Sequence, residues 1–376
     1  MLITGLVLIL LYILLIIAFY KGFDKVDDFY LQDYSPKMGF SVIITFRNEE
    51  DTLPALLESL YQLEYPSKLV EVLFINDDSS DKSVKLIESF IRQQRPKSTW
   101  KILNNERFSG SPKKDAVRLG IQNAHFRYIA TTDADVILPK YWLACFDAFL
   151  QAQPSTLIAG PVKLHKLQSF LDRYQAIDVL SLQGSTIGAF GWGHPFMCNA
   201  ANMCYDKEAF LSLDPYKQNQ HIASGDDVFL LEALVKHNPN QLGYIKSPQA
   251  VVSTSPVSSW NQLFHQRQRW ASKAKSTNLL IGKITGVLVL LTNLWILTLP
   301  LLVLIGQLNV KSALLFFLVK FSIDFLLVFK TARYLDETEV LFSFVPSSII
   351  YPFVSVYVVL LSLLRPYTWK QRSFKS

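Results

Sequence analysis

Two carboxylates stand one residue apart, at Asp133 and Asp135, in the stretch "IATTDADVILP" from Ile129 to Pro139. The residues before them have the composition of a buried strand, and burying an unpaired carboxylate is costly. A divalent cation makes two such charges compatible, because Mg²⁺ takes one or two carboxylates together with phosphate oxygens and water. In an extended segment residues i and i+2 point the same way, so both side chains would face one side. The alternative is a solvated turn with capping acids.

Two further acidic pairs occupy comparable positions. Asp77 and Asp78 follow the apolar run "VEVLFIN", where a carboxylate can cap the next helix or accept hydrogen bonds from a nucleobase or ribose. Asp226 and Asp227 open the helical pattern "DDVFLLEALVKH", where the helix dipole favours anions. Simple capping is again the alternative. The functional interpretation is a general base that deprotonates an acceptor hydroxyl.

A third kind of side chain comes late in the chain, in "QRQRW". Arg269 can pair with a phosphate, and Trp270 offers a flat apolar face to a sugar ring. Trp and Arg are also expected at a membrane interface, which is the alternative interpretation.

The elements that must position these residues alternate between strands and helices. Buried strands are predicted at Phe40–Phe46, Val70–Asn76, about 100–105 and 127–132, and a segment with helical spacing follows each of the first three. Asp51 or Thr52 would cap the first helix. This rhythm predicts an α/β fold with a parallel sheet, whose ligands bind at the carboxyl ends of the strands. The dinucleotide and P-loop glycine motifs are missing from the sequence. After Pro139 the rhythm weakens, and "LIAGPVKL" reads as one strand.

The apolar residues cluster at the two ends of the chain. Half of the 376 residues are hydrophobic and 18% are charged, against about 25% charged in a typical soluble domain. Stretches long enough to enter a bilayer run over Leu2–Tyr20, Ile284–Gly306, Ala313–Phe329 and Leu341–Leu364. The first lacks a basic start and a small-residue cleavage site, so an uncleaved anchor is favoured over a signal peptide. In the third, Lys320 and Asp324 are spaced to pair on one helix face, although an interfacial segment is equally open.

The formal charge of +6 comes largely from basic residues that lie beside the apolar stretches. Basic residues flank the apolar stretches, which places the central domain in the cytosol by the positive-inside rule. Four crossings would place the C-terminal tail outside the cytosol, yet the tail is basic too, and this conflict stays open. The basic residues beside the apolar stretches and in the tail are Lys21, Lys25, Arg267, Arg269, Lys273, Lys275, Lys330, Arg333, Arg365, Lys370, Arg372 and Lys375. No basic stripe with interleaved aromatic residues predicts nucleic-acid binding. The three cysteines, Cys145, Cys198 and Cys204, lack zinc-site spacing and are expected to be buried free thiols.

In order along the chain, "SVIITFRNEE", "INDDSSD", "TTDAD", "GDD" and "QRQRW" resemble the family 2 inverting glycosyltransferases of GT-A fold. The resemblance covers about residues 40–276 and is to the membrane-embedded branch, which includes ceramide glucosyltransferase and the hyaluronan, chitin and cellulose synthases. Gln266, Arg269 and Trp270 match the family's Q-x-x-R-W element letter for letter. Phe46 and Arg47 replace the more usual Tyr-Asn, and the loop before "DAVRLGI" has "SPKK" in place of Gly-Lys.

The resemblance implies roles for these residues. Asp227 would be the catalytic base, with Asp226 beside it, and Asp135 and Asp133 would bind Mg²⁺ or Mn²⁺. Gln266, Arg269 and Trp270 would close over the pyrophosphate and the acceptor, and Asn202 would line the acceptor side. Either Lys113 or Lys114 would lie near the nucleotide, and Lys114 is the one assigned to nucleotide binding. The assigned nucleotide-binding residues are Thr45, Glu49, Asp77, Asp78, Lys114 and Asp133.

The expected protein is therefore an integral membrane, metal-dependent glycosyltransferase with a Rossmann-like GT-A domain, one N-terminal and about three C-terminal transmembrane helices. It would move a sugar from a nucleotide donor, UDP-linked by expectation, to a lipid or lipid-linked acceptor. A processive polysaccharide synthase is the first alternative and a non-catalytic nucleotide-sugar-binding module the second. A transporter would need more polar residues in the apolar segments. The expected divisions are an anchor (1–22), a catalytic domain (38–276), membrane or interfacial helices (280–365) and a basic tail (366–376).

Overall fold

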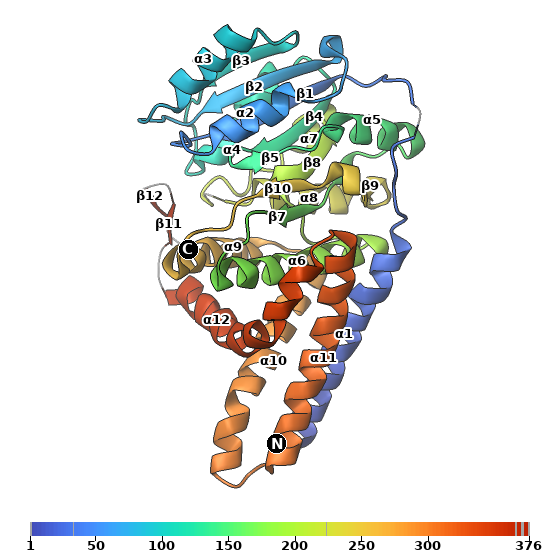
Figure 1. Cartoon of the computed structure of the whole chain (residues 1–376), viewed down its shortest axis with the longest axis vertical. Coiled ribbons are helices and arrows are strands. Elements are labelled where there is room, and N and C mark those ends of the chain that lie inside the picture. Colours follow the sequence, from blue (N-terminus) through green and yellow to red (C-terminus); the bar gives the residue numbers. More distant parts are fainter. Residues whose placement is uncertain (1, 33, 223, 365–366, 370–371, 375–376) are drawn as a thin grey trace. The chain divides into compact units, whose positions relative to one another are not determined.

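A computed structural model describes residues 2–32, 34–222, 224–364, 367–369 and 372–374 (Figure 1). The chain forms two compact units, each built from segments that are distant in sequence. The sheet unit comprises Asp27–His165 and Met197–Ser255. The helical unit comprises Met1–Val26, Lys166–Phe196 and Pro256–Ser376. The two units are made of several chain segments each, whereas the sequence divided the chain into consecutive segments. Those segments were assigned by function, and that assignment stays a prediction.

The sheet unit is centred on a seven-stranded sheet of order β3-β2-β1-β4-β8-β6-β9. Its first half is parallel, as predicted: β1 (Phe40–Phe46), β2 (Val70–Asn76), β3 (Thr99–Asn104) and β4 (Tyr128–Asp133) run the same way. β8 (Met203–Asp206) is antiparallel to β4 and to β6 (Leu157–Ala159), which pairs in parallel with β9 (Leu242–Tyr244). The α/β expectation is confirmed, and the strands that carry the candidate residues are the parallel ones.

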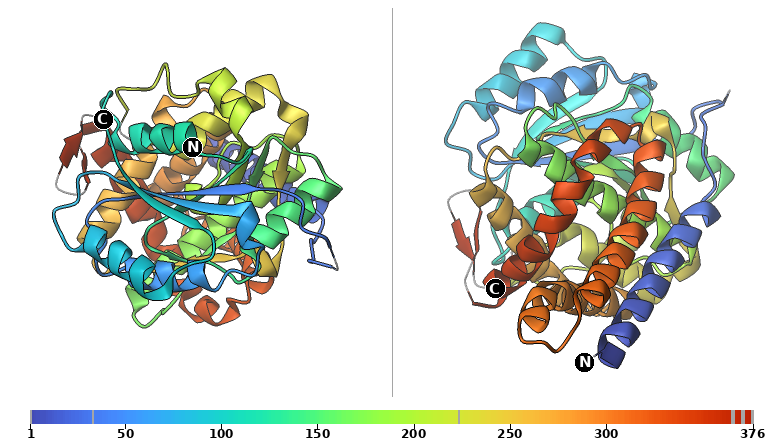
Figure 2. Two further views of the ribbon diagram at one scale, coloured as in Figure 1. Left: turned by 90° about the horizontal axis from the view of Figure 1, so that it is seen from above. Right: turned by 60° about the horizontal axis from the view of Figure 1, so that its bottom comes forward.

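Helices cover both faces of this sheet (Figure 2). α2 (Leu53–Tyr61) and α3 (Ser83–Gln94) share one hydrophobic core with the even-numbered residues of β1 and β2. α4 (Pro112–Asn123) covers the opposite face, where a Cβ on Gly120 would lie 2.8 Å from a methyl carbon of Ile43. The remaining helices of the unit are α5 (Trp142–Ala152), α7 (Lys207–Leu213), α8 (Asp226–His237) and the short 3-10 turns η1 (Ser67–Leu69), η2 (Ala200–Asn202), η3 (Pro239–Gln241) and η4 (Pro248–Ala250).

Two local expectations are wrong in the sheet unit. The stretch "LIAGPVKL" is two strands, because Gly160 and Pro161 separate β6 from β7 (Val162–Leu164). β7 joins β10 (Val252–Thr254) and β5 (Val136–Ile137) in a second, three-stranded sheet. Thr52 precedes α2 but does not cap it, since its hydroxyl donates to the Glu49 carboxylate at 3.0 Å.

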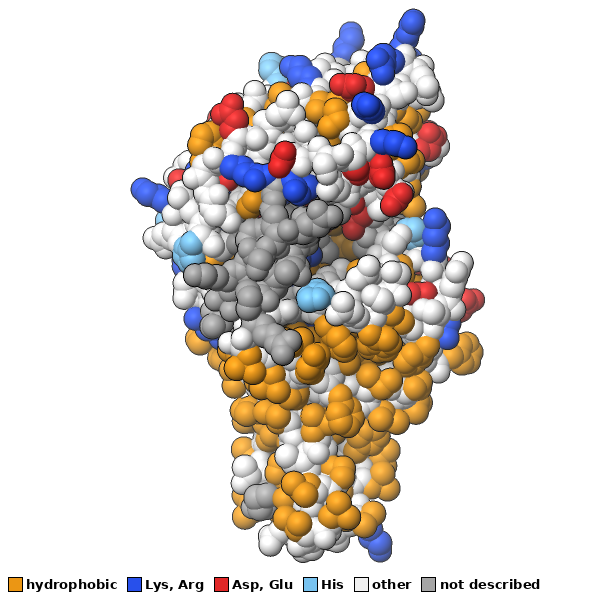
Figure 3. Space-filling view, turned by 90° about the vertical axis from the view of Figure 1, so that its left-hand side faces the viewer, with side chains coloured by type: hydrophobic (Ala, Val, Ile, Leu, Met, Phe, Trp, Pro, Cys, Tyr) orange, Lys and Arg blue, Asp and Glu red, His pale blue; other side chains and the backbone are white. Residues whose placement is uncertain are grey.

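The helical unit contains long apolar helices. Among the described residues, four helical stretches are long and apolar enough to cross a membrane. They are α1 (Leu2–Lys25), α10 (Leu280–Leu304), α11 (Val310–Tyr334) and the stretch Thr338–Leu364, which joins η5 (Thr338–Ser343) to α12 (Phe344–Leu364). On the face drawn in Figure 3, hydrophobic side chains predominate over the helices and are interspersed with uncharged polar ones, whereas most charged side chains lie on the sheet unit. α6 (Phe170–Gly191) and α9 (Trp260–Ser276) complete the helices, and β11 (Tyr367–Trp369) pairs with β12 (Arg372–Phe374). The predicted basic tail residues Arg365, Lys370 and Lys375 lie outside the described residues.

Glycine lets α1 and α6 approach each other at backbone distance. A Cβ on Gly188 of α6 would lie 2.3 Å from the carbonyl oxygen of Phe19, and one on Gly191 would lie 1.9 Å from the carbonyl oxygen of Gly22. Both contacts are far closer than any carbon side chain tolerates, so these positions require glycine. Small residues at helix contacts are a common means of packing helices in membranes.

The predicted pair in α11 is formed. Lys320 Nζ lies 2.6 Å from Asp324 Oδ2, and the hydroxyl of Tyr12 on α1 donates to Asp324 Oδ1 at 2.6 Å. Lys320 is 4% exposed. The buried cation is therefore neutralised within its own helix, and the same acid fastens α1 to α11. The three cysteines are buried and free, as expected.

Candidate active site

The register of the parallel strands brings the polar clusters to one edge of the sheet. Thr45 of β1 lies opposite Asp133 of β4. Phe46 lies opposite Asn76 of β2, which in turn lies opposite Asn104 of β3. Segments some 30 and 55 positions apart in sequence thus end at neighbouring points. The carboxyl edge of the sheet is where α/β folds bind ligands.

Lys113, at the start of α4, joins two of the predicted acidic clusters. Its Nζ lies 2.8 Å from Asp133 Oδ1 and 3.2 Å from Asp226 Oδ2. Burial opposes the charge of the lysine, but the carboxylates of Asp133 and Asp226 outweigh it and raise the pKa of Lys113. The lysine is therefore a fixed cation between the end of β4 and the start of α8.

The neighbouring lysine, Lys114, faces other groups. It is 2% exposed, and its Nζ donates to the backbone carbonyls of Asn219 and Ile222 at 2.8 and 2.9 Å. The ammonium also lies 4.3 Å from the ring centre of Phe229. These contacts give Lys114 a structural part in holding residues 219–222, and they favour Lys113 as the lysine of the site.

Asp226 and Asp227 occupy the first turn of α8, and both are buried. The residue before them, Gly225, has φ +96°, a left-handed backbone that favours glycine. Asp226 is paired with Lys113, whereas Asp227 Oδ1 accepts a hydrogen bond from the amide of Val228 at 2.8 Å. Both carboxylates thus stand at a helix N-terminus, where the helix dipole attracts negative charge.

Asp135 lies just past β4, in a turn rather than in extended backbone, so the i, i+2 argument for its direction was wrong. The carboxylate still interacts with Asp133. Desolvation by the surrounding protein, then repulsion from Asp133 and Glu49, raises the pKa of Asp135 to about 6, although its side chain keeps contact with solvent. An acid cluster that repels its own members fits a cation, since the cation would remove the repulsion.

Among the described residues, no three His, Cys, Asp or Glu side chains form a ready-made metal cage. Mg²⁺ can be held by one or two carboxylates and completed by phosphate oxygens and water. Asp133 and Asp135 are the carboxylates that could hold such an ion here, and Glu49 adds negative charge beside them.

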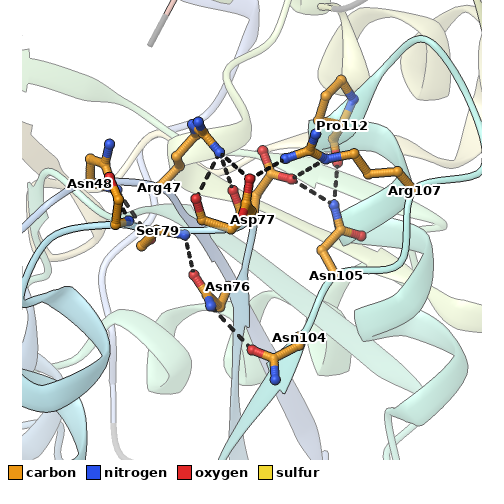
Figure 4. A network of polar contacts seen from close by, with 11 residues as sticks. Arg47, Asn48, Asn76, Asp77, Ser79, Asn104, Asn105, Arg107 and Pro112 are labelled. Atoms are coloured by element: carbon orange, nitrogen blue, oxygen red, sulfur yellow. Dashed lines mark hydrogen bonds and ion pairs between the residues drawn. The ribbon is translucent and has the colours of Figure 1, made fainter. Parts of the chain in front are cut away.

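The acids after β2 meet two arginines (Figure 4). Arg47 Nη1 donates to the carbonyl oxygens of Asp77 and Asp78, both at 2.8 Å, and Arg107 Nη2 lies 2.9 Å from Asp78 Oδ2. The hydrogen bond from Arg47, together with the charge of Arg107, lowers the pKa of Asp78. Asp77 is buried, and its Oδ1 accepts from Asn105 at 2.9 Å and faces Arg107 Nε at 3.4 Å. Asp78 adopts φ 61°.

Asn202 has a structural role in η2. It is fully buried there, and its amide oxygen accepts from Trp142 Nε1 at 2.9 Å. Its amide nitrogen donates to the carbonyls of Pro161 and Ala250 at 2.8 and 2.7 Å. The side chain therefore ties η2 to α5, to the turn between β6 and β7, and to η4. Its assignment to the acceptor side stays a prediction.

Gln266, Arg269 and Trp270 lie on α9 and belong to the helical unit. Within that unit Arg267 organises the segment: its Nε lies 2.6 Å from Asp178 of α6, and its guanidinium stacks 4.0 Å from the ring centre of Trp270. Arg267 also donates to Gln266 Oε1 at 2.7 Å. The pyrophosphate and acceptor roles of the three residues stay a prediction.

Sequence reasoning missed the side chains that the loops supply. Arg47 was noted only as a departure from the family pattern, and Asn105 and Arg107 were not singled out. The signal for Arg47 was its place directly after a strand, on the edge that holds the other site residues. No sequence signal marked Arg107, because its position depends on the path of the β3–α4 loop.

Comparisons with known proteins show which family and which fold this chain resembles. Residues 41–211 match the family described as glycosyl transferase family 2. The chain is 26% identical over 246 residues to the poly-beta-1,6-N-acetyl-D-glucosamine synthase of Staphylococcus epidermidis, covering 62% of this chain and 54% of the relative. It is 29% identical over 158 residues to the synthase of that name from Staphylococcus aureus, covering 39% of this chain and 34% of the relative. The chain thus spans about half of the first relative's length.

Among solved structures, the chain is similar to a mannosyltransferase from Pyrobaculum calidifontis in complex with GDP-Man and Mn²⁺. The TM-score is 0.54 at 16% sequence identity, over 92% of this chain and 96% of that one. At this identity the likeness shows the fold alone.

Proposed function

The chain carries a glycosyl transferase family 2 domain of GT-A fold, and from that premise we propose that it transfers a sugar, with inversion, from a UDP-sugar donor to a hydroxyl acceptor at a membrane. The observation that carries the proposal is the link made by Lys113 between Asp133 and Asp226. Lys113 brings the acid at the end of β4 close to the acids of α8. This supports the proposal, because sugar transfer requires the donor diphosphate and the acceptor hydroxyl to lie close together.

The residues divide the chemistry between them. Asp227 takes the proton of the acceptor hydroxyl as general base. Asp226 is held by Lys113 and keeps the first turn of α8 in place, which makes it a positioning residue. A single displacement inverts the anomeric carbon, so no second nucleophile is needed.

Asp133 and Asp135 would hold Mg²⁺ or Mn²⁺, and the related structure that contains GDP-Man and Mn²⁺ supports a divalent cation. When bound, the cation would offset negative charge on the diphosphate. Thr45, Glu49, Asp77 and Asp78 lie on or after the neighbouring strands β1 and β2, and we assign them to the donor nucleotide. Gln266, Arg269 and Trp270 are assigned to the pyrophosphate and acceptor.

The names of the relatives favour a polysaccharide synthase as the second candidate, with N-acetylglucosamine as the sugar. The first candidate is single transfer to a lipid or lipid-linked acceptor. The four apolar helical stretches support attachment to a membrane in both cases, and the basic residues beside them support a cytosolic catalytic unit. The size of the product separates the two candidates.

The proposal is tested by UDP release from purified protein with UDP-sugars, membrane lipid extract and Mn²⁺, followed by mass spectrometry of the product. Wild-type protein is expected to release UDP, and Asp227→Asn to lose about 10²- to 10⁴-fold of the rate, the usual contribution of a general base. Equal release by both proteins would remove Asp227 from its role. No release from any donor would favour the non-catalytic binding module.

A further inference from the structure

Asp178 of α6 and Arg267 of α9 form an ion pair inside the helical unit, and the proposed chemistry assigns no part to Asp178. Nε of Arg267 lies 2.6 Å from Asp178 Oδ2, and the two side chains are 10% and 11% exposed. Removing two charges from water costs free energy, and apolar residues of similar volume often stabilise a protein as well as a buried ion pair does. The pair therefore calls for a role beyond stability.

Other contacts already hold α6 against the start of α9. Gln175 binds the backbone of Val257 just before α9 begins: its Oε1 accepts from the Val257 amide at 3.0 Å, and its Nε2 donates to the Val257 carbonyl at 2.9 Å. The ring centres of Tyr174 and Trp260 lie 5.2 Å apart, and Leu263 is fully buried in the same cluster as Tyr174. These contacts bring the two helices together without the ion pair.

The guanidinium of Arg267 meets different residues through its different parts. Besides the bond to Asp178, its Nη1 donates to Gln266 Oε1 at 2.7 Å, and its central carbon lies 4.0 Å from the ring centre of Trp270. A guanidinium is planar and rigid, so an acid that holds Nε also sets the direction of Nη1 and the tilt of the flat face. Asp178 therefore controls how Arg267 meets two residues of the Q-x-x-R-W element.

Arg267 also decides which end of the Gln266 amide is available. A guanidinium has donors only, so only the amide oxygen of Gln266 can accept from it. The two N–H donors of the amide are then left for other groups, and the side chain is partly exposed. Phosphate oxygens accept such donors, whereas an amide turned the other way would present its own oxygen to them. The orientation that Arg267 imposes is the one that suits a diphosphate.

The same guanidinium holds the indole of Trp270. A cation 4.0 Å from the centre of an aromatic ring is attracted to the face of that ring, and Trp is the strongest aromatic partner for such a contact. The indole stays partly exposed, so part of its surface remains open to a sugar ring. Gln266 and Trp270 thus both depend on the orientation of a single arginine.

We propose that Asp178 is a positioning residue for sugar transfer: it acts through Arg267 to orient Gln266 toward the diphosphate and Trp270 toward the acceptor. The inference rests on the proposed function, which assigns Gln266 and Trp270 to those ligands. Negative charge on the diphosphate grows as its bond to the sugar breaks, so a correctly directed donor stabilises the transition state more than the bound substrate. Disturbing Asp178 is therefore expected to lower kcat more than it raises KM for the donor.

The test measures UDP release by the full-length protein in detergent, with Mn²⁺ and membrane lipid extract, over a range of UDP-sugar concentrations. Asp178→Asn keeps the size of the side chain but removes its charge, and Arg267→Lys keeps the charge but removes the guanidinium fork. Arg173→Lys is the matched control, because Arg173 also lies on α6 but its Nε donates to Ser343 of η5 at 2.8 Å. Thermal unfolding checks that each variant is folded, and Arg267→Lys carries the test should Asp178→Asn fail to fold.

A second arm separates positioning from a general structural role. Asp178→Asn is also made in a Gln266→Ala background, where the amide that Arg267 orients is missing. Effects that pass through one shared residue are not additive. The loss caused by Asp178→Asn is therefore expected to shrink in that background, whereas a purely structural loss would keep its size.

We expect Asp178→Asn and Arg267→Lys to lower kcat about 10- to 50-fold and to change KM for the UDP-sugar less than about threefold, while Arg173→Lys behaves as wild type. In the Gln266→Ala background, Asp178→Asn is expected to lower kcat less than about fivefold. An unchanged kcat in Asp178→Asn and Arg267→Lys overturns the inference, and so does an undiminished effect in the Gln266→Ala background or a comparable loss in Arg173→Lys. Failure of wild-type protein to release UDP would instead refute the proposed function.

Discussion

A matched pair in the helical unit and the acid cluster at the edge of the sheet are two different arrangements of charge. In the helical unit, Lys320 lies 2.6 Å from Asp324, and Arg267 lies 2.6 Å from Asp178. At the edge of the sheet, desolvation and then repulsion from Asp133 and Glu49 raise the pKa of Asp135. Charges that are matched within the protein need no ligand. Acids that repel one another are kept at a cost, and this difference distinguishes a site from a structural contact.

Breaking a matched pair gives the largest expected change in stability. Lys320→Met leaves Asp324, a partly buried acid, without its cation and is expected to lower the free energy of unfolding by about 2–4 kcal/mol. Replacing the whole cluster, with Lys320→Met, Asp324→Leu and Tyr12→Phe together, is expected to stay within about 1 kcal/mol of wild type. Urea unfolding in detergent, followed by tryptophan fluorescence, measures both. Equal losses in the single and triple variants would contradict a balanced pair.

Removing an unmatched acid gives the next largest effect, on activity. Asp135→Asn is expected to lower sugar transfer about 10²- to 10³-fold, because the charge that binds the cation is lost. The same change removes repulsion from the cation-free protein, so stability is expected to hold or rise by up to about 1 kcal/mol, after allowing for solvent screening. The exposed Asp51, changed to Asn, serves as control. A destabilised Asp135→Asn protein would show that the acids do not oppose each other.

The stabilisation of the protein by Mn²⁺ with UDP is expected to depend on pH, because Asp135 belongs to the acid cluster. The pKa of Asp135 is raised to about 6, so the folded protein binds this proton more tightly than the unfolded chain does. The cation-free protein therefore loses stability as pH rises from about 4 to about 6. Mn²⁺ competes with the proton, and its stabilisation is expected to be large at pH 7.5 and small at pH 5. Melting temperatures at both pH values test this, with Asp135→Asn expected to abolish the difference.

An exposed pair should respond least. Lys140 Nζ lies 2.6 Å from Glu64 Oε1, and both side chains are more than half exposed. Their mutual contact raises the pKa of Lys140 and lowers that of Glu64. Solvent screening makes such pairs weak, so Lys140→Ala is expected to leave the melting temperature unchanged within error. A clear drop would mean that distance alone, without burial, predicts the importance of a pair in this protein.

The sequence was sufficient for the parallel half of the sheet, because β-branched runs and helical spacing mark each strand and helix there. It was also sufficient to bring the residues after β1, β2 and β4 to one edge, since carboxyl ends of parallel strands share an edge. Asp226, at the start of α8, was linked to them only through the family resemblance. The sequence was not sufficient where two adjacent residues of a helix face different groups. Lys113 and Lys114 are adjacent, but about 100° of helix rotation sends one to the acids and the other to backbone carbonyls.

Asn202 and Arg107 show two other limits of sequence reasoning. A buried amide can also hold separate segments together, and its surroundings decide this. For Asn202 these surroundings are Trp142, Pro161 and Ala250. The place of Arg107 depends on a loop that Asp115 holds from the next helix. The contacts of Asn202 and Arg107 come from distant parts of the chain, so no local sequence pattern predicts them.

The backbone contact between α1 and α6 has a consequence for how this protein can be produced. Gly188 and Gly191 present bare peptide groups to Phe19 and Gly22. A shortened version that begins at Asp27, made to obtain a water-soluble enzyme, would leave that strip of α6 without its covering helix. Such a fragment is expected to aggregate or to require detergent even though its sheet is intact, and supplying residues 1–26 as a separate peptide would be the direct way to rescue it.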